Sequence, residues 1–255
     1  DSRMVDYYVR HFSPSTTFLV ATGNGGPGYG TITAPKPVVA LGIAASTQMG
    51  STGGTDSITD TRQITFGDIV PFSNRGPGAE GRTGVHLAAD GANAAGAIPI
   101  NTATNGAYAN TEWGGTSRST PVASGAIALV YQAFQRRTGR WPTWEEARAI
   151  LMSGARFNGY DTFTVGAGVL DAGDAVRIAA GLRGLYATPA EWTAGGYHGY
   201  THPAFASVVS PGEVATTTIT LHNPTDHPVA ATLAARTPRR IGSHEEAIIA
   251  DRTKE

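Results

Sequence analysis

Two short segments of this 255-residue chain place polar side chains where they could act on a carbonyl group. Asn24 follows an apolar run and lies between Gly23 and Gly25, two glycines that allow another backbone to come close. Ser117 stands at the predicted start of a long apolar helix, where free backbone N–H groups and the helix dipole favour negative charge. A hydroxyl nucleophile and an uncharged amide donor suit acyl transfer, because the carbonyl oxygen becomes negative only while it is attacked.

A nucleotide-binding interpretation of the glycine segment fails on its context. Gly23, Gly25 and Gly28 match the G-x-G-x-x-G pattern of dinucleotide-binding loops. In those proteins the glycines lead directly into a helix whose N-terminus holds the pyrophosphate. Pro35 and Pro37 forbid such a helix here, so the amide-donor interpretation of the segment is favoured.

The simpler interpretation of Ser117 is an N-cap or an ordinary first-turn residue. Against it, Gly114 and Gly115 leave open space directly before the serine. Pro121 also removes a backbone donor from a helix that is otherwise well formed, which indicates a constraint on this turn. Together these features favour a chemical role for Ser117.

Four blocks of sequence, in their order along the chain, resemble the subtilisin-like serine proteases. Residues 115–125 (GTSRSTPVASG) are similar to the nucleophile motif of that family, and residues 21–27 (ATGNGGP) to its oxyanion-asparagine segment. Residues 72–91 resemble its F-S-x-R-G-P…G-R…D-V-x-A-P-G region, although His86 stands for the usual acid and Ala89-Asp90-Gly91 for Ala-Pro-Gly. Residues 166–172 (GAGVLDA) resemble the block that closes the catalytic domain.

The resemblance, which spans roughly residues 1–180, implies a serine endopeptidase in which Ser117 is the nucleophile. Asn24 would donate to the oxyanion of the tetrahedral intermediate, together with the backbone N–H of Ser117. The residues in contact with a protein or peptide substrate would be Gly23, Gly25, Gly115 and Thr116. No cofactor is evident; structural calcium is implied by the resemblance only, and the sequence shows no ligand cluster for it.

A serine nucleophile needs a base that is itself oriented by a carboxylate, and the family motifs that supply them are missing. Neither an Asp-[ST]-Gly strand end nor a His-Gly-Thr-His helix occurs. The histidines lack the family context and are expected on the surface or in loops: His11, His86, His198, His202, His222, His227 and His244. His198 and His202 form an H-x-x-x-H pair, but it lacks the Glu of a zincin, so no metal site is expected there.

We therefore expect the catalytic Asp and His to come from an upstream segment or a companion chain. The chain opens within a predicted helix and stops early in a β-rich region, as a fragment would. Alone it should be inactive, because loss of the base costs a factor of about 10⁶ in this family. The alternative is a pseudoprotease that serves as a protein-binding or scaffold module, but the presence of both Ser117 and Asn24 argues against it.

The predicted elements give a three-layer α/β fold with a mainly parallel sheet. Strands are expected over residues 17–22, 38–45, 69–72 and 85–89; the second is a continuous apolar run, typical of a strand buried on both faces. Helices are expected over residues 1–12, 117–138, 143–154 and 172–180. In the first helix Met4, Val5, Tyr8 and Phe12 recur at helical spacing and predict its apolar face. The first half of the second helix, residues 121–134, is apolar almost all round and would lie in the centre of the domain. The third begins with a capping box, Thr143 to Glu146.

Two domains are predicted. Residues 1–183 would form the C-terminal portion of a subtilisin-like peptidase domain, and residues 184–255 a partial β-rich, fibronectin-III-like domain, the start of a β-sandwich-like extension. Within it, residues 214–221 and 229–234 are expected to pair as strands across a turn, and the charged tail after them to remain unpaired.

Composition excludes several classes of function. A net charge of −1 provides no field that would attract nucleic acid or an anionic membrane. No apolar run reaches the ~18 residues of a membrane-spanning helix. The absence of cysteine excludes disulfides and thiol chemistry. Extracellular localisation, by secretion, is implied by the family resemblance alone.

Overall fold

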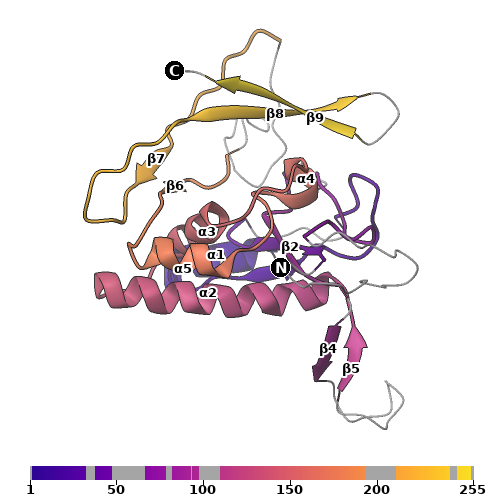
Figure 1. Cartoon of the computed structure of the whole chain (residues 1–255), viewed down its shortest axis with the longest axis horizontal. Coiled ribbons are helices and arrows are strands. Elements are labelled where there is room, and N and C mark those ends of the chain that lie inside the picture. The colour runs from indigo at the N-terminus through magenta and orange to yellow at the C-terminus, as the bar shows by residue number, and fades with distance from the viewer. Residues whose placement is uncertain are drawn as a thin grey trace.

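The structure is a computed structural model that describes residues 2–32, 38–47, 67–78, 82–92, 94–97, 110–192, 211–241 and 246–253. A parallel three-stranded sheet lies at the centre of its α/β part (Figure 1). The strands β1 (Leu19–Ala21), β2 (Leu41–Ser46) and β3 (Leu87–Asp90) are bonded in the order β1-β2-β3, and both pairs are parallel. All of β2 is buried, as its continuous apolar run predicts.

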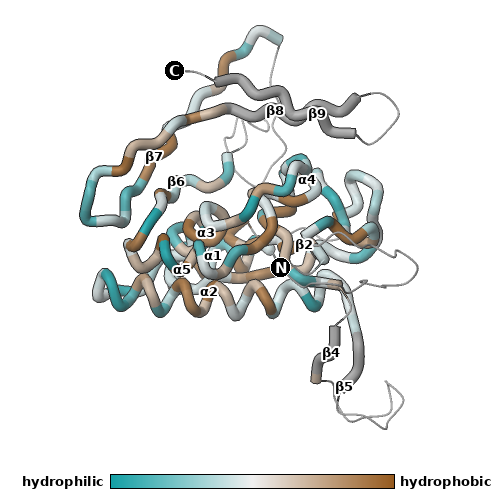
Figure 2. Tube along the Cα trace, viewed as in Figure 1, coloured by the Kyte–Doolittle hydropathy of each residue, from teal (hydrophilic) through white to brown (hydrophobic). Residues whose placement is uncertain are grey.

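Successive residues of the strands point to opposite faces of the sheet, as the pleat requires, and Ala45 contributes to a third, small cluster with Val70 and Ala92. Leu41 and Ile43 face the larger core, which is completed by β3 and by the helices α2 (Thr116–Thr138), α3 (Trp144–Ser153) and α5 (Ala172–Ala179). Ala44 faces the smaller core, which includes Val165 of the short helix α4 (Thr162–Val165). Both faces of the sheet are therefore covered, and the apolar residues gather along β2 and the helices (Figure 2).

The long helix α2 runs across the sheet and contacts all three strands (Figure 1). It begins after Gly115, and Gly139 ends it in the left-handed conformation with its N–H bonded to Gln135 O. The prediction that it is buried all round is wrong for the described part of the chain. Val122 and Leu129 on its outer face are 40% and 52% exposed, because only the opposite face meets the sheet.

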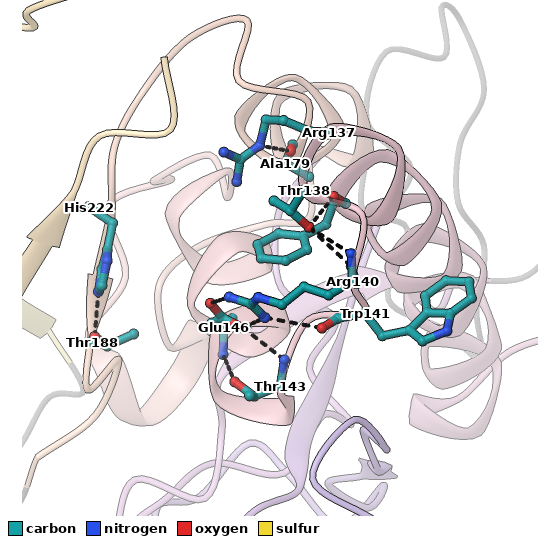
Figure 3. A network of polar contacts seen from close by, with 10 residues as sticks. Arg137, Thr138, Arg140, Trp141, Thr143, Glu146, Ala179, Thr188 and His222 are labelled. Carbon is teal, nitrogen blue, oxygen red and sulfur yellow. Dashed lines mark hydrogen bonds and ion pairs between the residues drawn. The ribbon is translucent and has the colours of Figure 1, made fainter. Parts of the chain in front are cut away.

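The connection from α2 to α3 follows the capping pattern of the sequence. Thr143 Oγ1 accepts from the Glu146 N–H at 3.2 Å, and Glu146 Oε2 accepts from the Thr143 N–H at 2.9 Å, which confirms the capping box. Arg140 donates to both carboxylate oxygens of Glu146, at 2.6 and 2.8 Å (Figure 3). The start of α3 is thereby fixed to the end of α2.

The predicted apolar face of the first helix is wrong in three of its four residues. In α1 (Ser2–Phe12) Met4, Tyr8 and Phe12 are exposed, whereas Val9 is fully buried. Asp6 Oδ1 accepts from the Val39 N–H at 3.0 Å, so the helix docks through its Asp6 and Val9 side. Helical spacing shows which residues share a face, but not which face meets the sheet.

Other predicted elements are shorter or paired differently. Residues 69–72 contribute only an isolated bridge between Ile69 and Ser46. The predicted pairing of 214–221 with 229–234 is wrong: β7 (Thr220–His222) pairs antiparallel with β6 (Tyr186–Thr188). His222 stacks on Tyr186 at 4.5 Å, and its Nε2 lies 2.7 Å from Thr188 Oγ1, which favours this pairing (Figure 3).

Two further strand pairs were not expected. β4 (Ala94–Ala97) and β5 (Asn110–Trp113) form an antiparallel pair that projects from the body near the start of α2 (Figure 1). β8 (Ala234–Ile241) and β9 (Glu246–Thr253) pair along their whole length, so the prediction of an unpaired tail is wrong. Backbone pairing needs no apolar alternation, which is why hydropathy patterning missed this ribbon. A β-sandwich-like extension stays a prediction, because the strands described after residue 183 form two-stranded pairs only.

Candidate active site

Ser117 lies in the first turn of α2 with its side chain exposed. The backbone N–H groups of Arg118 and Ser119 both donate to Gly115 O, at 2.9 and 3.2 Å. Among the described residues, neither the backbone N–H of Ser117 nor its hydroxyl has a hydrogen-bond partner. A helix start that leaves one N–H beside an exposed hydroxyl can bind an anionic oxygen at the point of attack.

The carboxamide of Asn24 is oriented by Thr116. Its Oδ1 accepts from the Thr116 backbone N–H at 2.9 Å and from the Thr116 hydroxyl at 2.8 Å. Because two donors face this atom, it must be the oxygen, and the Nδ2 donors are turned away from Thr116. The Thr116 hydroxyl also accepts from the Gly23 N–H at 3.1 Å, so this buried side chain joins the loop to the helix.

The two free donors converge beside Gly115. A Cβ atom on Gly115 would lie 3.2 Å from Asn24 Nδ2 and 3.7 Å from Ser117 N. Gly115 adopts φ +134°, which L-residues rarely do, and its missing side chain leaves this point open. This point is within hydrogen-bonding distance of Asn24 Nδ2 and 3.7 Å from Ser117 N, so both donors lie beside the open space, as an oxyanion hole requires.

The turn before Ser117 is supported from behind by the loop that follows β3. The Gly115 N–H donates to Gly91 O at 2.8 Å. A Cβ on Gly91 would lie 2.2 Å from Ser119 Oγ, so only glycine permits this approach. Asp90, which departs from the family pattern, forms an ion pair with Arg118 at 3.4 Å. The sequence did not predict this pair, because the two residues are 28 positions apart and meet only in the fold.

The sequence-predicted site residues are thus brought together at one place. Asn24, Gly23 and Gly25 lie on the loop after β1, and Gly115, Thr116 and Ser117 at the start of α2. The side chain of Thr116 is fully buried. Substrate contact by the four residues Gly23, Gly25, Gly115 and Thr116 stays a prediction.

No described histidine is hydrogen-bonded to Ser117. One of these histidines, His86, does not lie where the sequence predicted. His86 is only 5% exposed, so the prediction of a surface or loop position is wrong for this residue. Its Nδ1 accepts from the Gly42 N–H at 2.7 Å and its Nε2 lies 2.9 Å from Glu191 Oε2. The proton therefore lies on Nε2, and burial and the charge of Arg148 lower the pKa of His86.

Glu191 is the centre of this buried network. It binds Arg148 in an ion pair and accepts from Thr83 Oγ1 at 2.6 Å. Burial alone would raise the pKa of Glu191, but the hydrogen bond from His86 and the charge of Arg148 outweigh it and hold the pKa well below its ordinary value. The network ties the segment after β6 to the sheet, and it is a structural use of His86 rather than a catalytic one.

The other described histidines form no hydrogen bond with Ser117. His11 is exposed on α1, His222 stacks on Tyr186, and His227 pairs with Asp226. His198, His202 and His244 lie outside the described residues. Within the described ranges there is also no group of three or more His, Asp or Glu side chains that could hold a metal ion; structural calcium stays an expectation from the family resemblance.

Comparison with known proteins places this chain in a family. The profile of the Subtilase family matches residues 1–168. The chain therefore belongs to the subtilases, a family of serine proteases. In the part of the chain that the structure covers, no helix is long and apolar enough to cross a membrane.

Several of the similar solved structures are described as proteases. A lanthipeptide protease is 20% identical, with 69% of this chain and 54% of that chain covered and a TM-score of 0.49. The self-cleaved protease domain of PatA is 22% identical, with 71% and 55% covered and a TM-score of 0.48. The epidermin leader peptide processing protease EpiP of Staphylococcus aureus is 18% identical, with 69% and 43% covered and a TM-score of 0.47. This chain thus spans about half the length of these proteins. A search of curated proteins finds no match.

Proposed function

We propose that this chain carries the nucleophile and oxyanion hole of a serine endopeptidase that cleaves protein or peptide substrates by acyl transfer. The Ser117 hydroxyl attacks the scissile carbonyl carbon, and the acyl group passes to Oγ as the amine leaves. Asn24 Nδ2 and the Ser117 N–H donate to the oxygen as it becomes negative. The observation that carries the proposal is the convergence of these two donors on the open point beside Gly115.

We propose further that the catalytic Asp and His are supplied by an upstream segment or a companion chain. Two observations support this. No histidine or carboxylate among the described residues bonds to Ser117, and a serine hydroxyl is a weak nucleophile without a base. The outer face of α2, which begins beside Ser117, exposes Val122 and Leu129, and an apolar helix face is stable when another polypeptide covers it.

The mechanism predicts how the steady-state kinetics of the completed protease change. Ser117→Ala should abolish peptide hydrolysis. Asn24→Ala should lower kcat by about 10²–10³, the range known for loss of an oxyanion donor in this family, with little change in KM. Ser124→Ala is the matched control: it removes an exposed hydroxyl of the same helix, bonded to Thr120 O at 2.9 Å, and should leave kcat unchanged.

If Asn24→Ala instead raised KM and left kcat unchanged, the oxyanion role of Asn24 would be contradicted. A completed chain that never hydrolyses peptides, whatever residue stands at 117, would favour the alternative of a pseudoprotease acting as a binding or scaffold module. Secretion to the extracellular space is the localisation that we propose for such a peptidase.

A further inference from the structure

Asn74 occupies the variable position of the F-S-x-R-G-P segment, yet its side chain is fully buried beside the loop that carries Asn24. Its backbone N–H donates to Gly23 O at 3.0 Å. Its Nδ2 donates to Thr22 O at 2.9 Å, and its Oδ1 accepts from the Gly25 N–H at 2.5 Å. One residue therefore holds the chain both directly before and directly after Asn24.

We propose that Asn74 is a positioning residue of the oxyanion hole. Its three hydrogen bonds hold the backbone on both sides of Asn24 in the position from which the Asn24 carboxamide bonds to Thr116. The inference rests on the proposed role of Asn24 as an oxyanion donor, and it adds a residue that acts through Asn24 without touching the substrate. No role for Asn74 follows from the sequence, since the loop and Asn74 are about 50 residues apart and meet only in the fold.

The need for such a clamp follows from the bonds of Asn24 itself. Within the described residues its backbone N–H and C=O make no hydrogen bond, and only its side chain is fixed, by Thr116. The place of residue 24 is therefore set by the bonds of its neighbours. Asn74 makes three of these, to Thr22, Gly23 and Gly25.

A carboxamide of this length meets two demands at this position. Thr22 O requires a donor and the Gly25 N–H requires an acceptor, and the two groups of Asn74 supply one each. An aspartate would place a second acceptor against Thr22 O, and an aliphatic side chain would leave both groups unpaired in a buried place. Without the clamp the Asn24 donor is no longer held in place before the charge develops, and kcat should fall while KM stays nearly unchanged.

The test uses the 255-residue chain with ¹⁵N-labelled asparagine and measures the order of the Asn24 side-chain NH₂ group by NMR relaxation. The signals are assigned with Asn24→Asp. In the unmodified chain we expect an order parameter near that of rigid backbone, about 0.85, and in Asn74→Ala a value below about 0.6. The matched control is Ser73→Ala: Ser73 is equally buried, but its Oγ accepts from the Ala45 N–H at 3.0 Å and so binds the sheet and not the loop. It should leave the order of Asn24 unchanged.

Asn74→Asp provides a conservative rescue. A protonated carboxyl has one donor and one acceptor, as the carboxamide does, so in this variant Asn24 should be ordered when the carboxyl is neutral and lose order when it ionises. The unmodified chain should show no such change with pH. If Asn24 is as ordered in Asn74→Ala as in Ser73→Ala, the proposal is wrong.

Should Asn74→Ala fail to fold, the decision passes to Asn74→Asp and to hydrogen exchange of the Gly25 N–H in the unmodified chain. A protected Gly25 N–H supports the clamp, and exchange at the rate of an unprotected amide overturns it. None of these readouts involves reaction of Ser117. An ordered, Asn74-dependent Asn24 in a protein that never reacts would refute the protease function and leave the positioning role standing.

Discussion

Gly115 is the residue at which the geometry of the site can be tested by a single methyl group. In Gly115→Ala the new Cβ would stand 3.2 Å from Asn24 Nδ2 and 3.7 Å from Ser117 N, on the point where the oxyanion should lie. The residue would also keep φ +134°, and such a conformation costs an L-residue about 1–3 kcal/mol. We therefore expect both a less stable fold and a blocked hole.

Gly125→Ala is the matched control, because it makes the same change in the interior of the same helix. Nothing lies within 4 Å of a Cβ at Gly125, and alanine is favoured over glycine there by about 0.8–1.0 kcal/mol. The two variants should thus differ by about 2–4 kcal/mol in free energy of unfolding, with Gly115→Ala the less stable. For a chain of this size that difference separates their Tm values by about 5–15 °C.

Urea unfolding followed by circular dichroism measures the free energies of unfolding of the two variants. The rate at which a fluorophosphonate labels Ser117 in the completed protease tests the oxyanion hole. In Gly115→Ala we expect Ser117 to react with the fluorophosphonate at least about 10²-fold more slowly, which is the effect of losing one oxyanion donor. In Gly125→Ala it should react at the normal rate. If Gly115→Ala is as stable as Gly125→Ala, the backbone conformation assigned to Gly115 is wrong. If it is unstable but reacts at full rate, the oxyanion does not lie beside Gly115.

Three further predictions concern the surrounding fold. Glu191→Gln should cost about 3–5 kcal/mol at pH 7, because it leaves Arg148 buried without its partner. Since the folded-state pKa of Glu191 lies below its ordinary value, the stability from its ionisation is present above about pH 4.5 and lost as the pH falls; urea unfolding from pH 7 to 3 should show this part of the acid dependence in the unmodified chain and not in the variant. Burial and the hydrogen bond to Asp68 raise the pKa of Tyr160 to about 12, so the free energy of unfolding should fall as the pH rises from about 10 to about 12. The Tyr160→Phe variant should lose less stability over this range. Ultraviolet titration of tyrosine together with unfolding curves checks both expectations, and a Tyr160 that ionises near pH 10, the ordinary value for tyrosine, contradicts them. Thr143→Ala removes the N-cap of α3 and should cost about 1 kcal/mol, whereas Thr138→Ala, outside the cap, should cost less; equal losses by thermal unfolding would deny the capping box its role.

The parts of the site that the sequence predicts are those carried by local pattern. The glycine loop with Asn24 and the helix start with Ser117 are each continuous in sequence, and the four blocks resembling the family bring them together by analogy. The capping box of α3 is equally local, since it spans the four residues from Thr143 to Glu146. These features needed no knowledge of distant contacts.

The parts that the sequence does not predict depend on contacts between distant segments. Asn74 supports the oxyanion loop from 49 residues away in the chain, and Thr116 from about 93. His86 can be buried because Glu191, 105 residues further on, is the hydrogen-bond partner of its Nε2 and forms an ion pair with the nearby Arg148. Glu191 lies beyond residue 183, in a segment that composition assigned to the next domain. A histidine without local motif context could not be identified as a core residue from spacing alone.

The central claim is that this chain holds a complete oxyanion hole and nucleophile but not the base. The most direct measurement is intact-mass spectrometry after incubation with a fluorophosphonate, with the adduct mapped by peptide analysis. It compares the 255-residue chain alone with the same chain completed by the proposed upstream segment or companion chain. We predict no adduct on the chain alone, since loss of the base costs about 10⁶, and one adduct, on Ser117, in the completed protein. An adduct on Ser117 in the chain alone would show that the base is already present here. A completed protein without an adduct would contradict the assignment of Ser117 as the nucleophile.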